Sequence, residues 1–299
     1  MSERQKACAA ACGSNIIFGF SFLASSIAME AADPLLLLAI RFLLSAVFMT
    51  LLILVGVVHI QLKGKRPWRL IPLGLLQPVI YFACENYGIM YTNSSFAGTM
   101  IALIPLATLF MGIIFLGETC GPSQIGWAVC SFVGVAIVSL FGSEAGVVSV
   151  KGILILVAAV LSNSLFMVLS RRLADEFSAF ERTYVMFLMG SAAFILAAAA
   201  ENGFNGSRMA ESLLRCAKPD FAAAVVYLAL VSSVLAFLLI NYSAGKIEAR
   251  RSSSFASIST VVSIAAGVIF LGEPFGIPQL AGSILILVGV YRLNVGEAR

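Results

Sequence analysis

The segment Ile114-Phe115-Leu116-Gly117-Glu118 recurs as Ile269-Phe270-Leu271-Gly272-Glu273, 155 residues further along the chain. The same offset aligns Asn86-Tyr87 with Asn241-Tyr242, and residues 86–135 share 13 identities in 50 with their counterparts. A shared block in one register, with polar residues among the matches, exceeds what apolar composition produces by chance. The sequence therefore predicts two homologous halves, which we place at 1–142 and 150–295.

Charged residues are scarce in the segments that surround this repeat. The 299 residues are 60% hydrophobic and 11% charged, against about 25% charged in ordinary soluble domains. This composition excludes a soluble enzyme, a disordered chain and a nucleic-acid-binding protein. Long uncharged runs indicate membrane helices, because a helix satisfies its own backbone groups in lipid.

Turn signals divide these runs into ten predicted helices, and the fold class is an all-α membrane protein. The predicted helices cover residues 7–29, 34–58, 70–91, 94–116, 122–141, 151–170, 180–200, 220–243, 252–271 and 277–294. Each half holds five helices, an odd number, so the second half enters the membrane from the opposite side. Inverted repeats are typical of alternating-access transporters.

Basic residues predict the orientation in the membrane. One set of alternate loops holds 14 Lys and Arg, among them Arg171, Arg172 and Arg182, and the other set holds 4. The excess predicts that the protein lies in the plasma (inner) membrane with both termini in the cytoplasm. The first apolar run is long for a signal peptide, so we expect no cleaved leader.

The sequence resembles the drug/metabolite transporter superfamily, in particular its EamA-like family. The resemblance covers nearly the whole chain, and its motifs are specific only in combination with the repeat. They are Arg41-Phe42, Glu85-Asn86-Tyr87-Gly88, Tyr91-Thr92, Ser94-Ser95, Ile104-Pro105, Phe115-Leu116-Gly117-Glu118 and Phe270-Leu271-Gly272-Glu273. The resemblance implies a central cavity among helices one to four and six to nine, and a role in moving small metabolites. Thr260 departs from the pattern, because it stands where the first half has Pro105.

Arg41 and Glu85 are the two charges well inside predicted spans. Counted from Pro34 and Tyr91, both lie about 9–10 Å from the external face at 1.5 Å per residue. An unpaired charge at that depth is unfavourable, so we expect the two side chains to face the interior near each other. Three roles are open for them. The two side chains form a structural ion pair, or they bind the two charges of a zwitterionic substrate, or Glu85 carries a coupling proton. A tight ion pair opposes the last role, because it keeps Glu85 ionised.

Asparagines occur at matching places in both halves. Asn86-Tyr87 and Asn241-Tyr242 align, as do Ser14-Asn15 and Ser162-Asn163 at offset 148. Asn is unfavourable in lipid, so Asn15, Asn86, Asn163 and Asn241 should face the bundle. They line the cavity, with Tyr87 and Tyr242, or form interhelical hydrogen bonds.

Helix nine carries Ser257 and Thr260 on a small-residue face that serves either close helix packing or the cavity wall. Pro105 frees a backbone carbonyl and is a candidate hinge. Glu118 and Glu273 each follow a helix-ending glycine and precede a helix, so we interpret them as turn elements that favour the helix N-terminus.

These features predict a secondary transporter, in the export direction, for a small polar or amphipathic metabolite of the amino-acid type. The partners are that small molecule, the lipid bilayer and a coupling proton or ion, without nucleic acid. No catalytic set, metal cluster or phosphate-binding loop is found, so we expect neither an enzyme nor a cofactor. The alternatives are a channel and a membrane-embedded sensor or enzyme.

Overall fold

The computed structural model describes residues 2–61, 64–116, 123, 126–127, 129–134, 137, 149–247, 255–273 and 275–295. Within these ranges all regular structure is helical. The first half contains α1 (Glu3–Met29), α2 (Pro34–Leu54), η1 (Pro67–Leu70), α3 (Ile71–Gly74), η2 (Leu75–Ile80), α4 (Tyr81–Met90), α5 (Ser94–Ile101) and α6 (Ile104–Leu116). The second half contains α8 (Val150–Leu173), α9 (Ala179–Glu201), α10 (Gly206–Arg215), α11 (Pro219–Val226), η3 (Tyr227–Leu235), α12 (Ala236–Lys246), α14 (Ala256–Leu271) and α15 (Ile277–Val295).

Six described helical stretches are long and apolar enough to cross a membrane. They are Glu3–Met29, Pro34–Leu54, Ser94–Met111, Val150–Leu173, Ala179–Glu201 and Pro219–Lys246. The apolar segments Ile258–Leu271 and Ile277–Gly289 are shorter. Half of the predicted helix 122–141 lies outside the described residues, as do Ser252, Ser253 and Ser254 at the start of the predicted helix 252–271.

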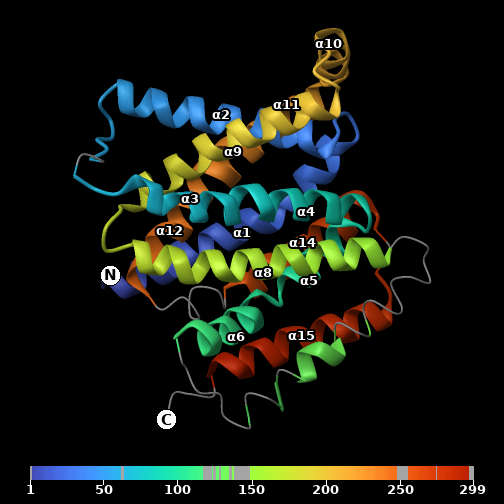
Figure 1. Cartoon of the computed structure of the whole chain (residues 1–299). Helices are drawn as coiled ribbons and strands as arrows, with labels where there is room; N and C mark the ends of the chain where they lie inside the picture. Colours follow the sequence, from blue (N-terminus) through green and yellow to red (C-terminus); the bar gives the residue numbers. More distant parts are fainter. Residues whose placement is uncertain are drawn as a thin grey trace.

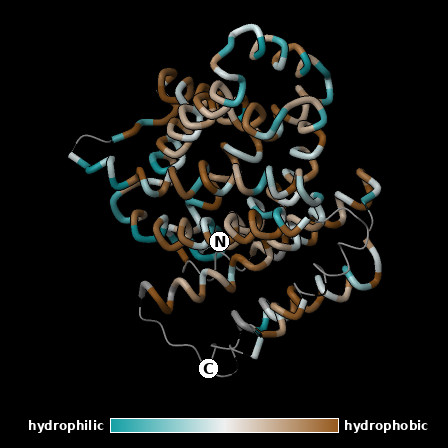
Figure 2. The backbone as a smooth tube through the Cα atoms, turned by 45° about the vertical axis from the view of Figure 1, so that its right-hand side comes forward, coloured by the Kyte–Doolittle hydropathy of each residue, from teal (hydrophilic) through white to brown (hydrophobic). Residues whose placement is uncertain are grey.

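The faces of these helices are sorted for a lipid environment. On α2, Leu43, Val47 and Leu51 form one exposed stripe at i, i+4, i+8 spacing, while Arg41 and Ser45 are buried. Large apolar residues are likewise exposed along the other long helices, and Figure 2 shows hydrophobic colouring over much of the bundle. A water-soluble protein would bury these apolar residues and expose the polar ones, so the chain is a multi-pass membrane protein.

The long helices run roughly side by side, left to right in Figure 1, which leaves two rims. The N-terminus lies at the left rim, and the amphipathic helix α10 projects beyond the bundle at the right. Helix α2 packs on α9, α1 packs on α14 and α12, and α4 packs on α8. Elements of the two halves thus interleave through the whole bundle.

The predicted continuous helix 70–91 is interrupted in the structure. Gln77 has φ −145° and ψ 120°, outside the helical region, directly before Pro78. A proline lacks the N–H that continues a helix and disfavours the helical conformation in the residue before it. The carbonyl of Leu76 accepts a 2.7 Å hydrogen bond from Ser162 Oγ on α8, which satisfies a group beside the break.

The predicted helix 94–116 is also divided. Helix α5 ends at Ile101, and α6 begins at Ile104 with Pro105 as its second residue. Proline suits the first turn of a helix, where its missing N–H breaks no hydrogen bond. Residues 94–116, predicted as one helix, therefore form two helices, and Pro105 lies in the first turn of the second.

Close contact between α5 and α14 joins the two halves. Thr260 Oγ1 donates a 2.8 Å hydrogen bond to the carbonyl of Gly98. A Cβ atom at Gly98 would overlap Ser263 Oγ, and one at Gly267 would overlap Ser95 Oγ and the carboxylate of Glu273. The absence of side chains at these glycines lets the two backbones approach.

Glu273 strengthens the same junction. Gly272 ends α14 with a φ of 63°, and the carboxylate that follows accepts 2.9 Å bonds from the backbone N–H groups of Ser94 and Ser95. It also accepts from both serine hydroxyls. Glu273 thus caps the N-terminus of α5 in the other half. The sequence had instead suggested that Glu273 favours the N-terminus of the helix that directly follows Glu273 in the chain. Glu118 lies outside the described residues.

The glycine contact predicts a selective loss of stability. Gly98→Ala should lower the free energy of unfolding by about 1–3 kcal/mol, because its methyl group overlaps Ser263. Gly13→Ala is the matched control, because its Cβ would meet only Leu239, at 3.9 Å. Thermal unfolding of both purified variants in detergent gives the comparison. Equal midpoints would contradict the tight packing of α5 on α14.

Candidate functional site

A small cavity lies inside the bundle, where helices of both halves meet. Its free volume is about 50 Å³, and α1, α4, α8, α12 and α14 all contribute to its wall. Gln77, at the break before α4, and Ile101 and Ile104, on either side of the break between α5 and α6, also line it. Its principal polar lining residues are Asn15, Ser21, Gln77, Tyr81, Glu85, Asn163 and Ser259.

Glu85 is the one charged residue in this wall, as far as the chain is described. Its side chain is buried, with 4% of its surface exposed, and Oε2 has no hydrogen-bond partner. A buried carboxylate without donors is destabilising, so its presence calls for an explanation outside packing. Intramembrane carboxylates of this kind mark substrate or ion pathways.

Arg41 is buried beside the cavity but does not line it. Its Nε donates to Ser233 Oγ at 2.8 Å and its Nη2 to Ser232 Oγ at 3.1 Å, both on the π-helical η3. Its guanidinium lies 4.3 Å from the centre of the Phe82 ring, whose side chain does line the cavity. The guanidinium is thus held between two hydroxyls of η3 and the Phe82 ring of α4.

The expected close pairing of Arg41 with Glu85 is not formed. The two attract each other electrostatically, yet the ion pairs between described residues do not include them. The reason is that Ser232 and Ser233 offer the guanidinium nearer acceptors. The charges share a region of the bundle, but only the carboxylate reaches the cavity.

Asn15 and Asn163 both line the cavity, from α1 and α8. Asn15 Nδ2 donates to the carbonyl of Ala11 at 2.8 Å, and Asn163 Nδ2 lies 3.4 Å from Gln77 Oε1. The neighbouring Ser162 bonds to Leu76, so α8 contacts the interrupted helix through two consecutive residues. Two asparagines that align between the halves thus line the same cavity.

Aromatic side chains complete the cavity wall. The Phe18 and Phe237 rings pack edge to face with centroids 5.4 Å apart, and Phe82 lies 5.8 Å from Phe237. Tyr81 packs against Phe82 at 5.0 Å. Phe22 and Phe166 also line the space. The cavity therefore combines one carboxylate and several amides with a largely aromatic surface.

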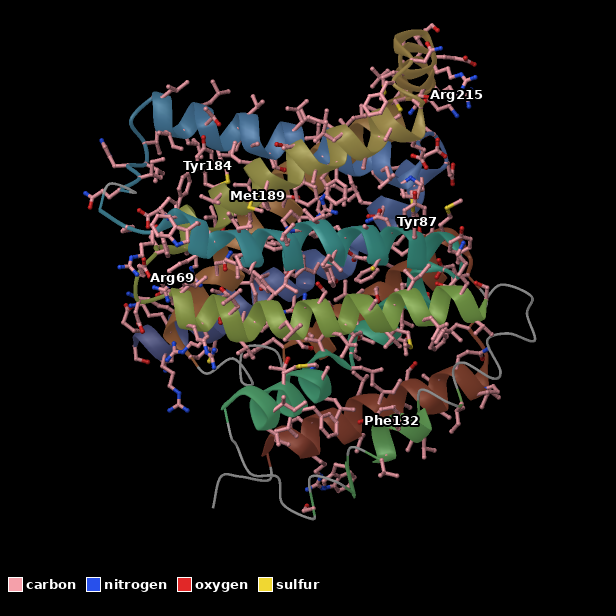
Figure 3. All side chains as sticks on the ribbon, viewed as in Figure 1. Arg69, Tyr87, Phe132, Tyr184, Met189 and Arg215 are labelled. Atoms are coloured by element: carbon pink, nitrogen blue, oxygen red, sulfur yellow. The ribbon has the colours of Figure 1, made fainter. Side chains whose placement is uncertain are left out.

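The remaining sequence candidates lie elsewhere. Asn86 is buried, donates to the Phe82 carbonyl and leaves its Oδ1 without a partner. Tyr87 reaches Glu201 at 3.4 Å, at the right rim (Figure 3), and Tyr242 reaches Glu3 at 3.1 Å, beside the N-terminus. None of these three residues lines the cavity.

Thr260 makes the helix contact with Gly98 described above, and Pro105 starts α6 next to the lining residue Ile104. The side chain of Ser257 lies outside the described part of the structure. Its neighbour Ser259 lines the cavity instead, with its hydroxyl bonded to the Ala256 carbonyl.

Asn241 belongs to a buried network that the sequence did not suggest. Arg182, counted among the basic loop residues, is in α9 and only 2% exposed. It donates to the carbonyls of Ser170 and Asn241, both at 2.7 Å, while Asn241 Nδ2 donates to Thr183. Arg182 thereby joins α8, α9 and α12.

Gln77 is one of the cavity residues that sequence reasoning missed, as are Ser21, Tyr81 and Ser259. The available signal for Gln77 was Pro78 in the middle of a predicted span, because the residue before a proline tends to leave the helix. Its burial beside Asn163 depends on tertiary packing and has no local signature.

The different surroundings of the two charges predict different effects on stability. Arg41→Gln should lower the free energy of unfolding by about 2–5 kcal/mol, because it removes the charge-assisted hydrogen bonds to Ser233 and Ser232. Glu85→Gln should be neutral or stabilising, since the carboxylate Oε2 has no partner to lose. Thermal unfolding in detergent measures both. Comparable destabilisation by Glu85→Gln would instead indicate a structural ion pair.

Comparison with known proteins agrees with this architecture. The model of the EamA-like transporter family matches residues 5–140 and again 150–295. An uncharacterized transporter of Bacillus subtilis, YcxC, is 33% identical over 282 residues, which cover 94% of this chain and 90% of the relative. A probable amino-acid metabolite efflux pump of Salmonella typhimurium is 22% identical over 94% of this chain and 91% of the relative.

One solved crystal structure superposes with a TM-score of 0.67 at 21% identity, covering 99% of this chain and 98% of the other, so the fold is shared along the whole length. Both halves match the family model, and the relatives cover nearly all of the sequence. The chain belongs to the EamA-like transporter family and is a transporter rather than an enzyme.

Proposed function

We propose that this protein is a secondary transporter that exports a small polar or amphipathic metabolite of the amino-acid type by alternating access, with the central cavity as its substrate site. The observation that carries the proposal is the buried carboxylate of Glu85, which lines the cavity and has an unpartnered oxygen. A bound substrate that donates hydrogen bonds would supply what the protein leaves open.

The interrupted helix beside Glu85 supports a substrate site here. Transporters commonly place substrate and ion sites near the bilayer midplane, where discontinuous helices expose backbone groups to a cavity. The breaks at Gln77 and between Ile101 and Ile104 both lie at this cavity. Irregular backbone is tolerated inside a membrane protein where it faces protein or a polar cavity.

The ten-helix inverted repeat provides the mechanism. We infer that residues 1–142 and 150–295 are two five-helix halves of opposite orientation, supported by the repeat at offset 155 and the double family match. The aligned residues Asn15 and Asn163 line the same cavity. Rocking of one half against the other would expose this cavity to each side in turn.

Contacts between the halves close both rims. At the rim that carries the N-terminus, Lys65 pairs with the buried Glu181 at 2.6 Å, and Arg69, labelled in Figure 3, pairs with Glu176. At the opposite rim Glu273 holds Ser94 and Ser95. Access to the cavity from either side requires one of these sets to separate, which is what alternating access demands.

The proposed direction of transport and the proposed membrane location are supported by the sequence and by one relative. The excess of Lys and Arg in alternate loops supports a plasma (inner) membrane protein with both termini in the cytoplasm. The Salmonella relative carries an efflux name. A proton or other ion is the coupling partner that a secondary exporter needs.

The proposal predicts a substrate-dependent exchange activity. Metabolites that accumulate in the medium of an overproducing strain, and are depleted in a deletion strain, identify the substrate. Purified protein in liposomes should then show saturable counterflow of that metabolite, which separates a carrier from a channel. Glu85→Gln should slow counterflow by about tenfold or more, because a charge-assisted hydrogen bond is lost.

Glu211→Gln is the matched control, because Glu211 lies exposed on α10, paired with Arg215 and far from the cavity wall. It should retain full counterflow. Full activity in both Glu85→Gln and Arg41→Gln would overturn the assignment of the cavity as the substrate site.

A further inference from the structure

Several hydrogen-bond donors in the cavity wall are already engaged by the protein. Three polar lining side chains donate to backbone carbonyls of their own helices at 2.7–2.8 Å. These bonds are Asn15 Nδ2 to Ala11, Ser21 Oγ to Phe18, and Ser259 Oγ to Ala256. A serine hydroxyl has a single proton, so Ser21 and Ser259 keep only lone pairs for a ligand.

The amides follow the same pattern. Asn163 directs its amide nitrogen to Gln77 Oε1, and Asn15 directs its own to Ala11. Each asparagine keeps its amide oxygen, which is an acceptor, and one amide N–H. Gln77 Nε2 and the Tyr81 hydroxyl remain as neutral donors in the wall.

Charge in the cavity is of one sign. Glu85 contributes the carboxylate, and neither a lysine nor an arginine lines the wall along the described chain. The nearest candidate, Arg41, is held by Ser232 and Ser233 and packs on the Phe82 ring. A substrate carboxylate entering this space would meet Glu85 without a cation to offset the repulsion.

The aromatic surface favours the same sign of ligand. Phe18, Phe82, Phe166 and Phe237 line the cavity. Aromatic faces attract cations, and this attraction grows when both partners are removed from water. The free volume of about 50 Å³ exceeds the roughly 10–15 Å³ that one water-sized group needs, so the space accommodates an ammonium group.

We propose that the cavity recognises the protonated amino group of its substrate, through Glu85 and the asparagine oxygens, and makes no use of a substrate carboxylate. This inference rests on the proposed function, because it names the chemical class that the transport site accepts. Amphipathic amines, including amino-acid derivatives whose carboxyl group is absent or blocked, are then substrates, and carboxylic acids without an amine are not.

A matched series of ligands tests the charge preference on the unmodified protein. 2-Phenylethylamine, L-phenylalanine and 3-phenylpropionate share one aromatic group and differ in charge. Binding is measured by calorimetry on the full chain in detergent, and transport by competition in liposomes. We expect the amine to bind at least about tenfold more tightly than 3-phenylpropionate, with L-phenylalanine no tighter than the amine.

Variants assign the preference to the cavity. Glu85→Gln should abolish the difference between amine and acid, whereas Glu211→Gln, a neutralised carboxylate exposed on α10, should preserve it. Arg41→Lys keeps the charge of the buried cation and should also preserve the preference. The series on unmodified protein needs no variant, so a variant that fails to fold leaves the test intact.

The outcomes separate the two proposals. Binding of the amine without its movement across the membrane supports the amine site and overturns the transport function. Saturable transport with equal or better use of 3-phenylpropionate supports transport and overturns the amine site. Neither binding nor transport of any member of the series overturns both.

Discussion

A carboxylate inside an apolar helix bundle is the constraint on which the rest of this structure depends. Glu85 is buried with an unpartnered oxygen, in a setting where an unsolvated charge is strongly unfavourable. Stability alone does not require it, because a glutamine or an apolar side chain would pack there without that penalty. The surrounding wall is consistent with a ligand site, because amides, hydroxyls and aromatic rings line it and the cation of Arg41 is held behind it.

The backbone around the cavity is arranged by a related requirement, that polar groups in a membrane find partners within the protein. The break at Gln77 frees groups that a continuous helix would bond, and Ser162 of the other half takes up the Leu76 carbonyl. Arg41 is bonded by hydroxyls of a π-helical stretch, and Arg182 by carbonyls of two neighbouring helices. The break at Gln77 and the π-helical stretch are therefore both stabilised across the interface between the halves, which couples the cavity to their relative position.

Sequence periodicity and charge predicted the all-α membrane fold and the family, because long uncharged runs and a repeat are local signals. The same reasoning identified Glu85, since a lone acid in an apolar run stands out, and Asn15 and Asn163 through their alignment. It missed Gln77, whose role depends on Pro78 and on packing against α8. It placed Arg182 in a loop, because burial at a helix start depends on neighbours that the sequence does not show. The partners of Arg41 and Glu273 lie 178 to 192 residues away and have no local signature.

The central claim is that Glu85 faces the ligand while Arg41 does not. An experimental structure of the full chain in lipid nanodiscs, with its transported amine bound, tests this claim most directly. The account predicts ligand density in the central cavity, with the amine nitrogen about 2.7–3.2 Å from a carboxylate oxygen of Glu85 and Arg41 still bonded to Ser232 and Ser233. A ligand seated outside this cavity, or one whose carboxylate is bound by the guanidinium of Arg41, would contradict it.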